Sequence, residues 1–175
     1  MSAKPRVLLF TGNGKGKTTA ALGMALRACG HGIRVLMLQF VKGDPTTGEL
    51  AAARHLPNLE IVQTGLGFLP EPTSPEFAEH RAAAERGLKM AAGALASGRY
   101  GMVILDEVCF AAARGLLDEE SICAAVRRAP AECCVVLTGR GATPALIALA
   151  DTVTEMNAVK HVCEAGRPAQ KGVEY

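Results

Sequence analysis

The sequence predicts an α/β fold with one doubly wound, mostly parallel β-sheet that carries helices on both faces. Short continuous apolar runs alternate with helical segments along the whole chain. Such runs are typical of strands buried on both faces of a parallel sheet. A glycine-rich loop follows the first run directly, where a strand gives way to a helix. Crossovers between parallel strands are right-handed almost without exception, which favours the doubly wound arrangement.

In the N-terminal half, the apolar run at 7–10 predicts the first strand. The segment 20–29 is rich in alanine, leucine and methionine and stops at Gly30 and Gly32, as expected of a helix. The remaining elements expected here are a strand at 33–41, a short helix at 49–56 and a strand at 59–64.

The C-terminal half begins with a loop at 65–75, which holds three prolines. From Phe77 to Leu95, apolar residues recur at the spacing of one helix face, and Gly98 ends that helix. The expected elements that follow are a strand at 100–105, helical pieces around 110 and at 119–128, a strand at 133–138, a helix at 144–150 and a last strand at 152–156.

Size and composition predict a single domain and exclude some classes of binding partner. A chain of 175 residues with 49% hydrophobic residues forms one domain, 1–175, with a sizeable core. A net charge of +2 is too small to require nucleic acid or an anionic membrane as a partner. With 4% aromatic residues, a stacking surface for single-stranded nucleic acid is not expected either.

The six cysteines form no CxxC pair, which excludes the common zinc and redox motifs. Cys133 and Cys134 lie in an apolar run and are expected to be buried free thiols. The N-terminal apolar stretch is too short for a signal peptide, and no apolar run is long enough to span a membrane. These features predict a cytoplasmic protein.

The loop from Gly12 to Thr18 predicts a phosphate-binding site. Its glycines allow backbone N–H groups to turn inward, and the helix N-terminus adds a partial positive charge. Lys17 is expected to neutralise phosphate oxygens, and the Thr18 hydroxyl to bind Mg²⁺. The loop departs from the common P-loop spacing, because Gly12 is only four residues before Gly16.

A second part of the site is expected from Asp106 and Glu107, which end a continuous apolar run. If this strand lies beside the first one, its carboxylates come close to the metal bound by Thr18. The loop and the acidic pair together predict a Mg²⁺–nucleoside triphosphate as the ligand.

The spacing of these residues does not decide which bond of the nucleotide breaks. Hydrolases of this fold cleave between the β- and γ-phosphates with the help of a positioned water or an arginine. Arg27, on the first helix, and Arg140, after a later strand, are the candidate arginines. A P-loop ATPase, a small-molecule kinase and a nucleotide-binding regulatory module without turnover all remain open at this point.

The whole chain resembles the P-loop ATP:corrinoid adenosyltransferases. The matching segments run in order through nearly the whole chain: 11–19 (TGNGKGKTT), 39–43 (QFVKG), 105–107 (LDE), 138–141 (TGRG), 150–155 (ADTVTE) and the tail 159–175. The unusual loop spacing is itself the form found in this family. The resemblance implies a RecA-like P-loop NTPase fold.

The resemblance also implies the reaction. The 5′-deoxyadenosyl group of ATP moves to cobalt(I) of a corrinoid, which is cobyrinic acid a,c-diamide, cobinamide or cobalamin, and triphosphate is released. The expected partners are Mg²⁺ or Mn²⁺, a second copy of the chain in a homodimer, and an electron donor such as a flavodoxin or flavin reductase.

The loop, the acidic pair and the candidate arginines together give the expected residue roles. The expected catalytic residues are Lys17, Thr18, Glu107 and Arg140, and the expected metal ligands are Thr18, Asp106 and Glu107. The residues expected to bind ATP are Gly12, Asn13, Gly14, Lys15, Gly16, Lys17, Thr18, Thr19 and Arg27.

Leu66 and Phe68 occupy the position where the family has an apolar wedge that binds the corrinoid and excludes its lower ligand. Six residues precede Val7, so no N-terminal segment is expected to cover the site. His161 is expected to have a structural or phosphate-facing role, because a histidine bound to cobalt would oppose the four-coordinate state.

Overall fold

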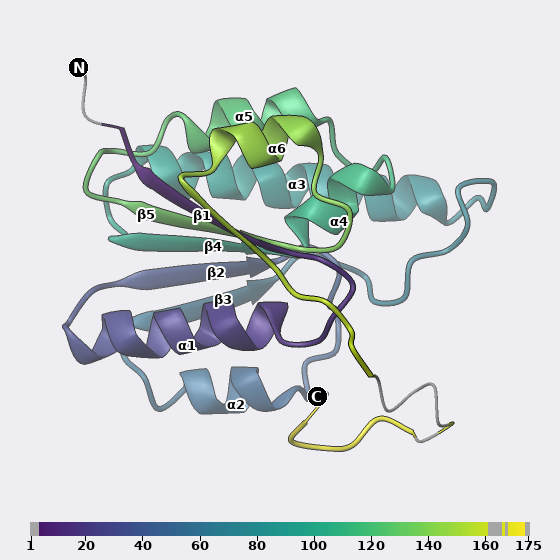
Figure 1. Ribbon diagram of the computed structural model, residues 1–175, viewed down its shortest axis with the longest axis horizontal. Coiled ribbons are helices and arrows are strands. Elements are labelled where there is room, and N and C mark those ends of the chain that lie inside the picture. Colours follow the sequence, from purple (N-terminus) through teal and green to yellow (C-terminus); the bar gives the residue numbers. More distant parts are fainter. Residues whose placement is uncertain (1–3, 161–165, 167, 174–175) are drawn as a thin grey trace.

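The computed structural model describes residues 4–160, 166 and 168–173 (Figure 1). Within these residues, one six-stranded, all-parallel sheet runs through the molecule in the order β3-β2-β4-β5-β1-β6. The strands are β1 (Arg6–Thr11), β2 (Val35–Gln39), β3 (Leu59–Gln63), β4 (Met102–Asp106), β5 (Cys134–Thr138) and β6 (Thr152–Glu155).

Helices cover both faces of the sheet (Figure 1). One face carries α1 (Lys17–Gly30) and α2 (Gly48–Ala53). The other face carries α3 (Phe77–Ala96), α4 (Val108–Ala113), α5 (Glu119–Val126) and α6 (Pro144–Leu149). None of the helices in the described ranges is both long and apolar enough to cross a membrane.

The core has two apolar layers, one on each side of the sheet. Alternate residues of each central strand point to opposite faces, so that Val103 and Leu105 of β4 contribute to one layer and Met102 and Ile104 to the other. The buried apolar residues that α1 presents to the second layer are alanines, at 21, 25 and 28, and Leu22, Met24 and Cys29 pack against this layer while partly covered. The small alanine side chains allow α1 to pack closely over the strands and fix its N-terminus at their carboxyl edge.

The predicted fold class is confirmed, since the sheet is parallel and carries helices on both faces. One expectation about neighbouring strands is wrong. β4 does not lie beside β1, because β5 lies between them and pairs with both. The acidic pair still reaches the glycine-rich loop, because α1 crosses under these strands and brings its N-terminus to the end of β4. This helix also begins at Lys17, three residues before the segment expected from the sequence.

Cysteines in the described part of the chain are free thiols. Cys133 is buried, as expected, while Cys134 is only partly covered. Burial raises the pKa of Cys109 to about 12 and that of Cys133 to about 11, so both thiols stay protonated at neutral pH. Thiolate chemistry at these two positions is therefore not expected.

The loops that follow β2 and β3 touch each other through glycine. The Gly67 N–H donates to the Val41 carbonyl at 2.9 Å. A Cβ at Gly65 would lie 2.2–2.5 Å from backbone atoms of Val41, and one at Gly43 would lie 2.9 Å from the Gly65 carbonyl oxygen. Only glycine fits at such distances, so these residues hold the two loops together.

We expect Gly65→Ala to lower the free energy of unfolding by about 1–3 kcal/mol, because the added methyl group forces two backbones apart. Gly93→Ala is the matched control. Gly93 lies in α3 with nothing within 4 Å of an added Cβ, and alanine there should raise stability by roughly 0.5–1 kcal/mol. Urea denaturation measures both changes. A Gly65→Ala protein as stable as the parent would show that the loop contact is not tight.

Candidate active site

A row of polar side chains crosses the carboxyl edge of the sheet on the α1 face. Gln63, Gln39 and Asp106 lie in register on β3, β2 and β4, and Thr138 ends the next strand. Each side chain bonds to its neighbour: Gln63 Nε2 donates to Gln39 Oε1 at 3.1 Å, Gln39 Nε2 to Asp106 Oδ2 at 3.4 Å, and Thr138 Oγ1 to Asp106 Oδ1 at 2.8 Å. The apolar core ends at this row.

Asp106 is the charged member of the row and is fully buried. Its Oδ1 also accepts a hydrogen bond from Thr18 Oγ1, in the first turn of α1, at 2.8 Å. Burial raises the pKa of Asp106, and the hydrogen bonds from Thr138 and Thr18 oppose that shift. The structure thus brings together Thr18 and Asp106, as the sequence predicts.

Lys17 closes the glycine-rich loop. Its ammonium donates to the carbonyl oxygens of Gly12 and Gly14 at 2.8 and 2.7 Å, and the residue is 6% exposed. Burial lowers the pKa of Lys17, while the negative charges of Glu107 and Asp106 raise it. Gly12 and Gly16 both have positive φ angles, which glycine adopts without strain. The loop therefore holds a cation where a phosphate would lie.

Glu107 follows Asp106 in a strained backbone conformation. It is the one non-glycine residue with a positive φ in the described chain, at 61°. Its N–H donates to Thr138 Oγ1 at 2.8 Å, which helps to hold this conformation. Burial and the charge of Asp106 raise the pKa of Glu107, and the positive Lys17 opposes them. Strain of this kind in a non-glycine residue is typical of functional sites.

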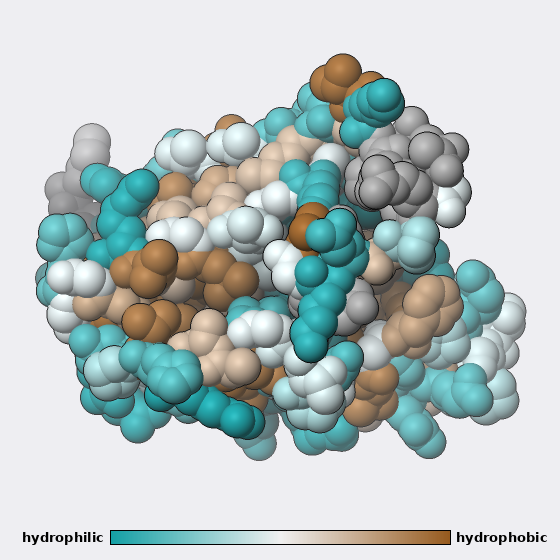
Figure 2. All heavy atoms as spheres, turned by 90° about the horizontal axis from the view of Figure 1, so that it is seen from below, coloured by the Kyte–Doolittle hydropathy of each residue, from teal (hydrophilic) through white to brown (hydrophobic). Residues whose placement is uncertain are grey.

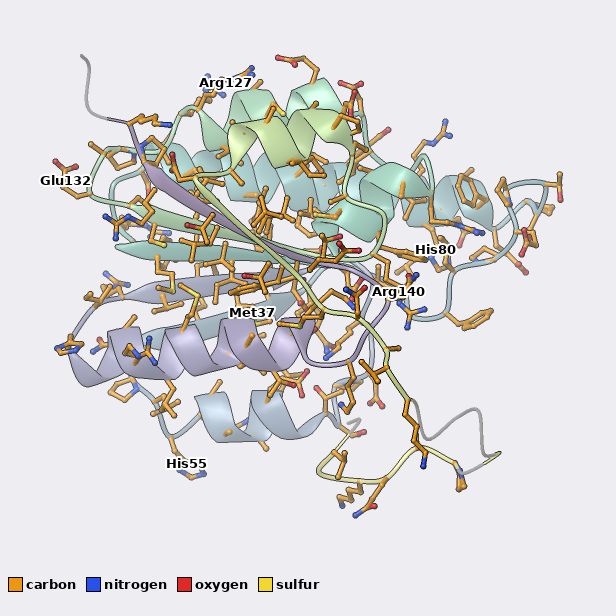
Figure 3. All side chains as sticks on the ribbon, viewed as in Figure 1. Met37, His55, His80, Arg127, Glu132 and Arg140 are labelled. Carbon is orange, nitrogen blue, oxygen red and sulfur yellow. The ribbon has the colours of Figure 1, made fainter. Side chains whose placement is uncertain are left out.

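A cleft of about 700 Å³ opens above these residues. Its polar end is lined by the loop residues 14–19, Glu107 and Arg140, and Figure 3 shows Arg140 beside this end of the sheet. Its apolar part is lined by leucines at 22, 26, 56 and 59, on the face where Figure 2 shows apolar side chains over α1 and α2.

The structure does not bring all predicted ATP ligands to this cleft. Arg27 is exposed in the last turn of α1, ten residues after Lys17 and roughly 15 Å along the helix from it, and does not line the cleft. Gly12 and Asn13 do not line it either. Gly12 acts through its carbonyl oxygen, which binds Lys17.

A second cavity, of about 560 Å³, lies between the loops after β2 and β3 and α4. Val41, Phe68, Leu69 and Phe110 give it apolar walls. The side chain of Phe68 is 96% exposed, so it is free to contact a ligand. Leu66 is 51% exposed but does not line this cavity, so of the two expected wedge residues only Phe68 does.

Lys42 lines both cavities and separates them. Its ammonium donates to Glu49 Oε1 at 2.6 Å, and Gln39 Nε2 donates to the same oxygen at 3.1 Å. Although burial opposes it, these hydrogen bonds hold the pKa of Glu49 below its ordinary value. A hydrogen-bonded chain therefore runs from Lys42 through Glu49 and Gln39 to Asp106.

The sequence analysis assigned no role to Gln39, Gln63, Lys42 or Glu49. The sequence did contain a pattern that could have identified Gln39 and Gln63. Gln39 and Gln63 are polar residues at the ends of apolar runs, as are Asp106 and Thr138, and parallel strands bring such positions to one edge. Glu49 lies on the short helix α2, and nothing in its local sequence distinguishes it from a surface carboxylate.

The segment after β6 packs against the glycine-rich loop. The Gly14 N–H donates to the Met156 carbonyl at 2.6 Å, and Lys15 Nζ donates to the Val173 carbonyl at the same distance. A Cβ at Gly12 or Gly14 would lie within 2.4–2.7 Å of the Met156 carbonyl oxygen. These glycines thus make room for a neighbouring backbone as well as for a turn. His161 lies outside the described residues.

Comparison with known proteins agrees with this geometry. Residues 3–175 match the family model described as ATP:corrinoid adenosyltransferase BtuR/CobO/CobP. The chain belongs to this family. A corrinoid adenosyltransferase from Pseudomonas aeruginosa is 45% identical over 170 residues, which are 97% of this chain and 83% of that protein. Corrinoid adenosyltransferases from Salmonella typhimurium and Escherichia coli K12 are each 38% identical, over 97% of this chain and 85% of their own length.

For this adenosyltransferase family member, the strain at Glu107 gives a testable contrast. Glu107→Gln and Glu107→Gly both remove the carboxylate, but only glycine also relieves the left-handed backbone. We expect the glycine variant to be more stable than the glutamine variant by about 0.5–1 kcal/mol in urea denaturation. Both variants should lose most adenosyl transfer. Equal free energies of unfolding for the two variants would show that the left-handed backbone at 107 does not destabilise the fold.

Proposed function

We propose that this chain transfers the 5′-deoxyadenosyl group of ATP to cobalt(I) of a corrinoid. The cobalt(I) electron pair attacks carbon 5′, the bond from that carbon to the α-phosphate oxygen breaks, and triphosphate leaves with the bonding electrons. The observation that carries the proposal is the pair of adjoining cavities, one with a phosphate-binding loop and one with apolar walls, that share Lys42.

The glycine-rich loop is the part of the site suited to binding triphosphate, the leaving group. Negative charge develops on triphosphate as carbon 5′ departs, and donors fixed before the reaction stabilise such charge most effectively. Lys17 is buried and Arg140 lines the same cleft, so both can donate to triphosphate oxygens. The Lys17 ammonium is already positioned by carbonyl oxygens, which limits the reorganisation needed on binding.

The residues present also fit Mg²⁺. A hard cation of this size binds carboxylate and hydroxyl oxygens together with phosphate oxygens. Thr18 and Glu107 line the cleft, and Thr18 Oγ1 lies 2.8 Å from Oδ1 of the buried Asp106. When bound, the cation would neutralise phosphate charge. The three side chains would hold it, and the hydrogen bonds from Thr138 and Gln39 keep Asp106 oriented.

The second cavity suits the corrin macrocycle, which is broad, flat and largely apolar. Val41, Leu69 and Phe110 give it apolar walls, and the exposed ring of Phe68 can cover a face of the macrocycle. Exclusion of the lower ligand from cobalt(II) would make reduction to cobalt(I) easier, because axial ligation tunes the potential of a metal centre. Cobalt(I) is itself the nucleophile, so no protein group needs to act as a general base.

Product analysis tests the function against an ATPase or kinase. The purified protein is mixed anaerobically with ATP, Mg²⁺ and a chemically reduced corrinoid. Triphosphate and an alkylated corrinoid, identified by its visible spectrum, are the expected products, whereas ADP would contradict adenosyl transfer.

Lys17→Ala is expected to lower the rate of adenosyl transfer roughly ten- to a hundredfold through the loss of one charge-assisted contact.

A second experiment separates the chemistry from reduction. Phe68→Ala should slow turnover strongly when a weak biological reductant must generate cobalt(I), and much less when a strong reductant supplies it beforehand. Met90→Ala, which truncates another exposed apolar side chain on α3, should change neither rate. An equal loss under both reductants would mean that Phe68 only holds the corrin in place.

The electron donor, the homodimer and the cytoplasmic location stay predictions of the sequence. A flavodoxin or flavin reductase would have to reach the corrin, and the exposure of Phe68 leaves that side of the second cavity accessible.

A further inference from the structure

Lys42 is the one residue, among those that the structure describes, that lines both cavities. It comes from the loop after β2 and belongs neither to the glycine-rich loop nor to the acidic pair at the end of β4. With ATP in the first cavity and a corrin in the second, the bond that breaks lies where the cavities adjoin. The side chain shared by both cavities at this junction is therefore a cation.

Lys42 approaches the site from the side opposite to Lys17. The strands that lead into their loops, β2 and β1, are three strand spacings apart, or roughly 14 Å. Burial and the charge of Asp106 raise the pKa of Glu107, while the positive charges of Lys17 and Lys42 are among those that lower it. Glu107 is thus within electrostatic reach of both lysines. Because the corrin would lie on the Lys42 side, the end of ATP that carries carbon 5′ and the α-phosphate would face Lys42.

The Lys42 ammonium is held in place but keeps donors available. Its hydrogen bond within the described part of the chain goes to Glu49 Oε1, at 2.6 Å. An ammonium has three N–H donors, so two remain for solvent or a ligand. The side chain is 30% exposed, so a ligand in either cavity can reach it. Gln39 Nε2 donates to the same Glu49 oxygen at 3.1 Å, which fixes the carboxylate that in turn fixes the lysine.

A cation held in this way suits the charge that develops in the reaction. As carbon 5′ leaves the α-phosphate oxygen, negative charge grows on that phosphate, and donors fixed in advance stabilise such charge with little reorganisation. Hydrogen bonds from a charged donor are roughly twice as strong as those between neutral groups. Pairing with Glu49 occupies one N–H of Lys42 and leaves the other two able to make such bonds.

Resting on the proposed function, we infer that Lys42 is a further catalytic residue, which donates hydrogen bonds to the α-phosphate of ATP as the bond from carbon 5′ to oxygen breaks. The cobalt(I) electron pair forms the cobalt–carbon bond, the electrons of the broken bond leave with the triphosphate oxygen, and Lys42 keeps its proton throughout. Glu49 is the positioning residue that holds the ammonium. Because the contact strengthens as charge develops, its loss falls mainly on the rate of the chemical step.

The test measures single turnovers with saturating ATP and a corrinoid that is reduced beforehand, so that reduction does not limit the rate. Lys42→Met and Lys42→Ala should each lower the rate of alkylation roughly ten- to a hundredfold. The Kd values for ATP and for the cobalt(II) corrinoid, titrated separately, should change less than about threefold. Lys89→Met, which neutralises an exposed lysine on α3, should leave the rate unchanged.

Small amines distinguish a catalytic ammonium from a structural one. Lys42→Ala leaves space beside Glu49, and ethylammonium can occupy this space and donate to the same phosphate. The rate of this variant should rise with the concentration of ethylammonium. Tetramethylammonium at the same ionic strength should not raise the rate, because it has no N–H to donate.

A double variant keeps the test decisive if the single variants are unstable. The Glu49 side chain is only 11% exposed, and without Lys42 its hydrogen-bond partner is Gln39 alone. Lys42→Met combined with Glu49→Gln removes both charges, so its free energy of unfolding should exceed that of Lys42→Met. Its rate of alkylation should nevertheless stay low.

A parent-like rate in Lys42→Met would overturn the inference and leave the proposed function in place. Recovery of the rate in the double variant, with no effect of ethylammonium on Lys42→Ala, would show that Lys42 serves only to pair with Glu49. A raised Kd for the corrinoid with an unchanged rate would place Lys42 against the corrin instead of the phosphate. A parent protein that forms no alkylated corrinoid would remove the proposed function itself, and the inference with it.

Discussion

The buried carboxylate of Asp106 is the constraint on which the site depends. An isolated charge at 0% exposure is costly, and here it is compensated by hydrogen bonds from three different elements. Thr18 comes from α1, Thr138 from β5 and Gln39 from β2. Each donor fixes one element relative to the end of β4. The same bonds that make the charge tolerable therefore assemble the phosphate-binding loop, the strained Glu107 and the partition between the two cavities.

Close backbone contacts explain why the two cavities adjoin. Gly65 and Gly43 allow the loops after β2 and β3 to touch, which draws Phe68 towards Lys42. On the other side, the Gly14 N–H donates to the Met156 carbonyl oxygen, and a Cβ at position 14 would lie too close to the Met156 backbone. The glycines in these segments thus matter because their missing side chains allow neighbouring backbones to come close. The glycine-rich loop and the second cavity are each held by a partner segment distant in the sequence.

Most of the element order was predictable, because apolar runs and helical spacing are local properties of the chain. Strand order was not, since the spacing of runs does not say which strands pair, and the insertion of β5 between β1 and β4 went unforeseen. That Lys17, Thr18, Asp106 and Glu107 lie together could be predicted, because the first two follow a glycine-rich loop at a helix start and the last two follow an apolar strand. Arg27 could not be placed correctly, because its position along α1 matters more than its charge.

The strand order also bears on where the proposed reaction would take place. β1 and β2 are separated by β5 and β4, so the phosphate loop and the loop that carries Lys42 lie three strand spacings apart, or roughly 14 Å. With triphosphate in the glycine-rich loop and a corrin in the second cavity, as proposed, carbon 5′ of ATP and the cobalt would meet between them, near the end of β4. Asp106 and Glu107 are located there. In the proposed reaction, β4 lies between the two substrates, and the carboxylates at its end would hold the cation beside the departing triphosphate.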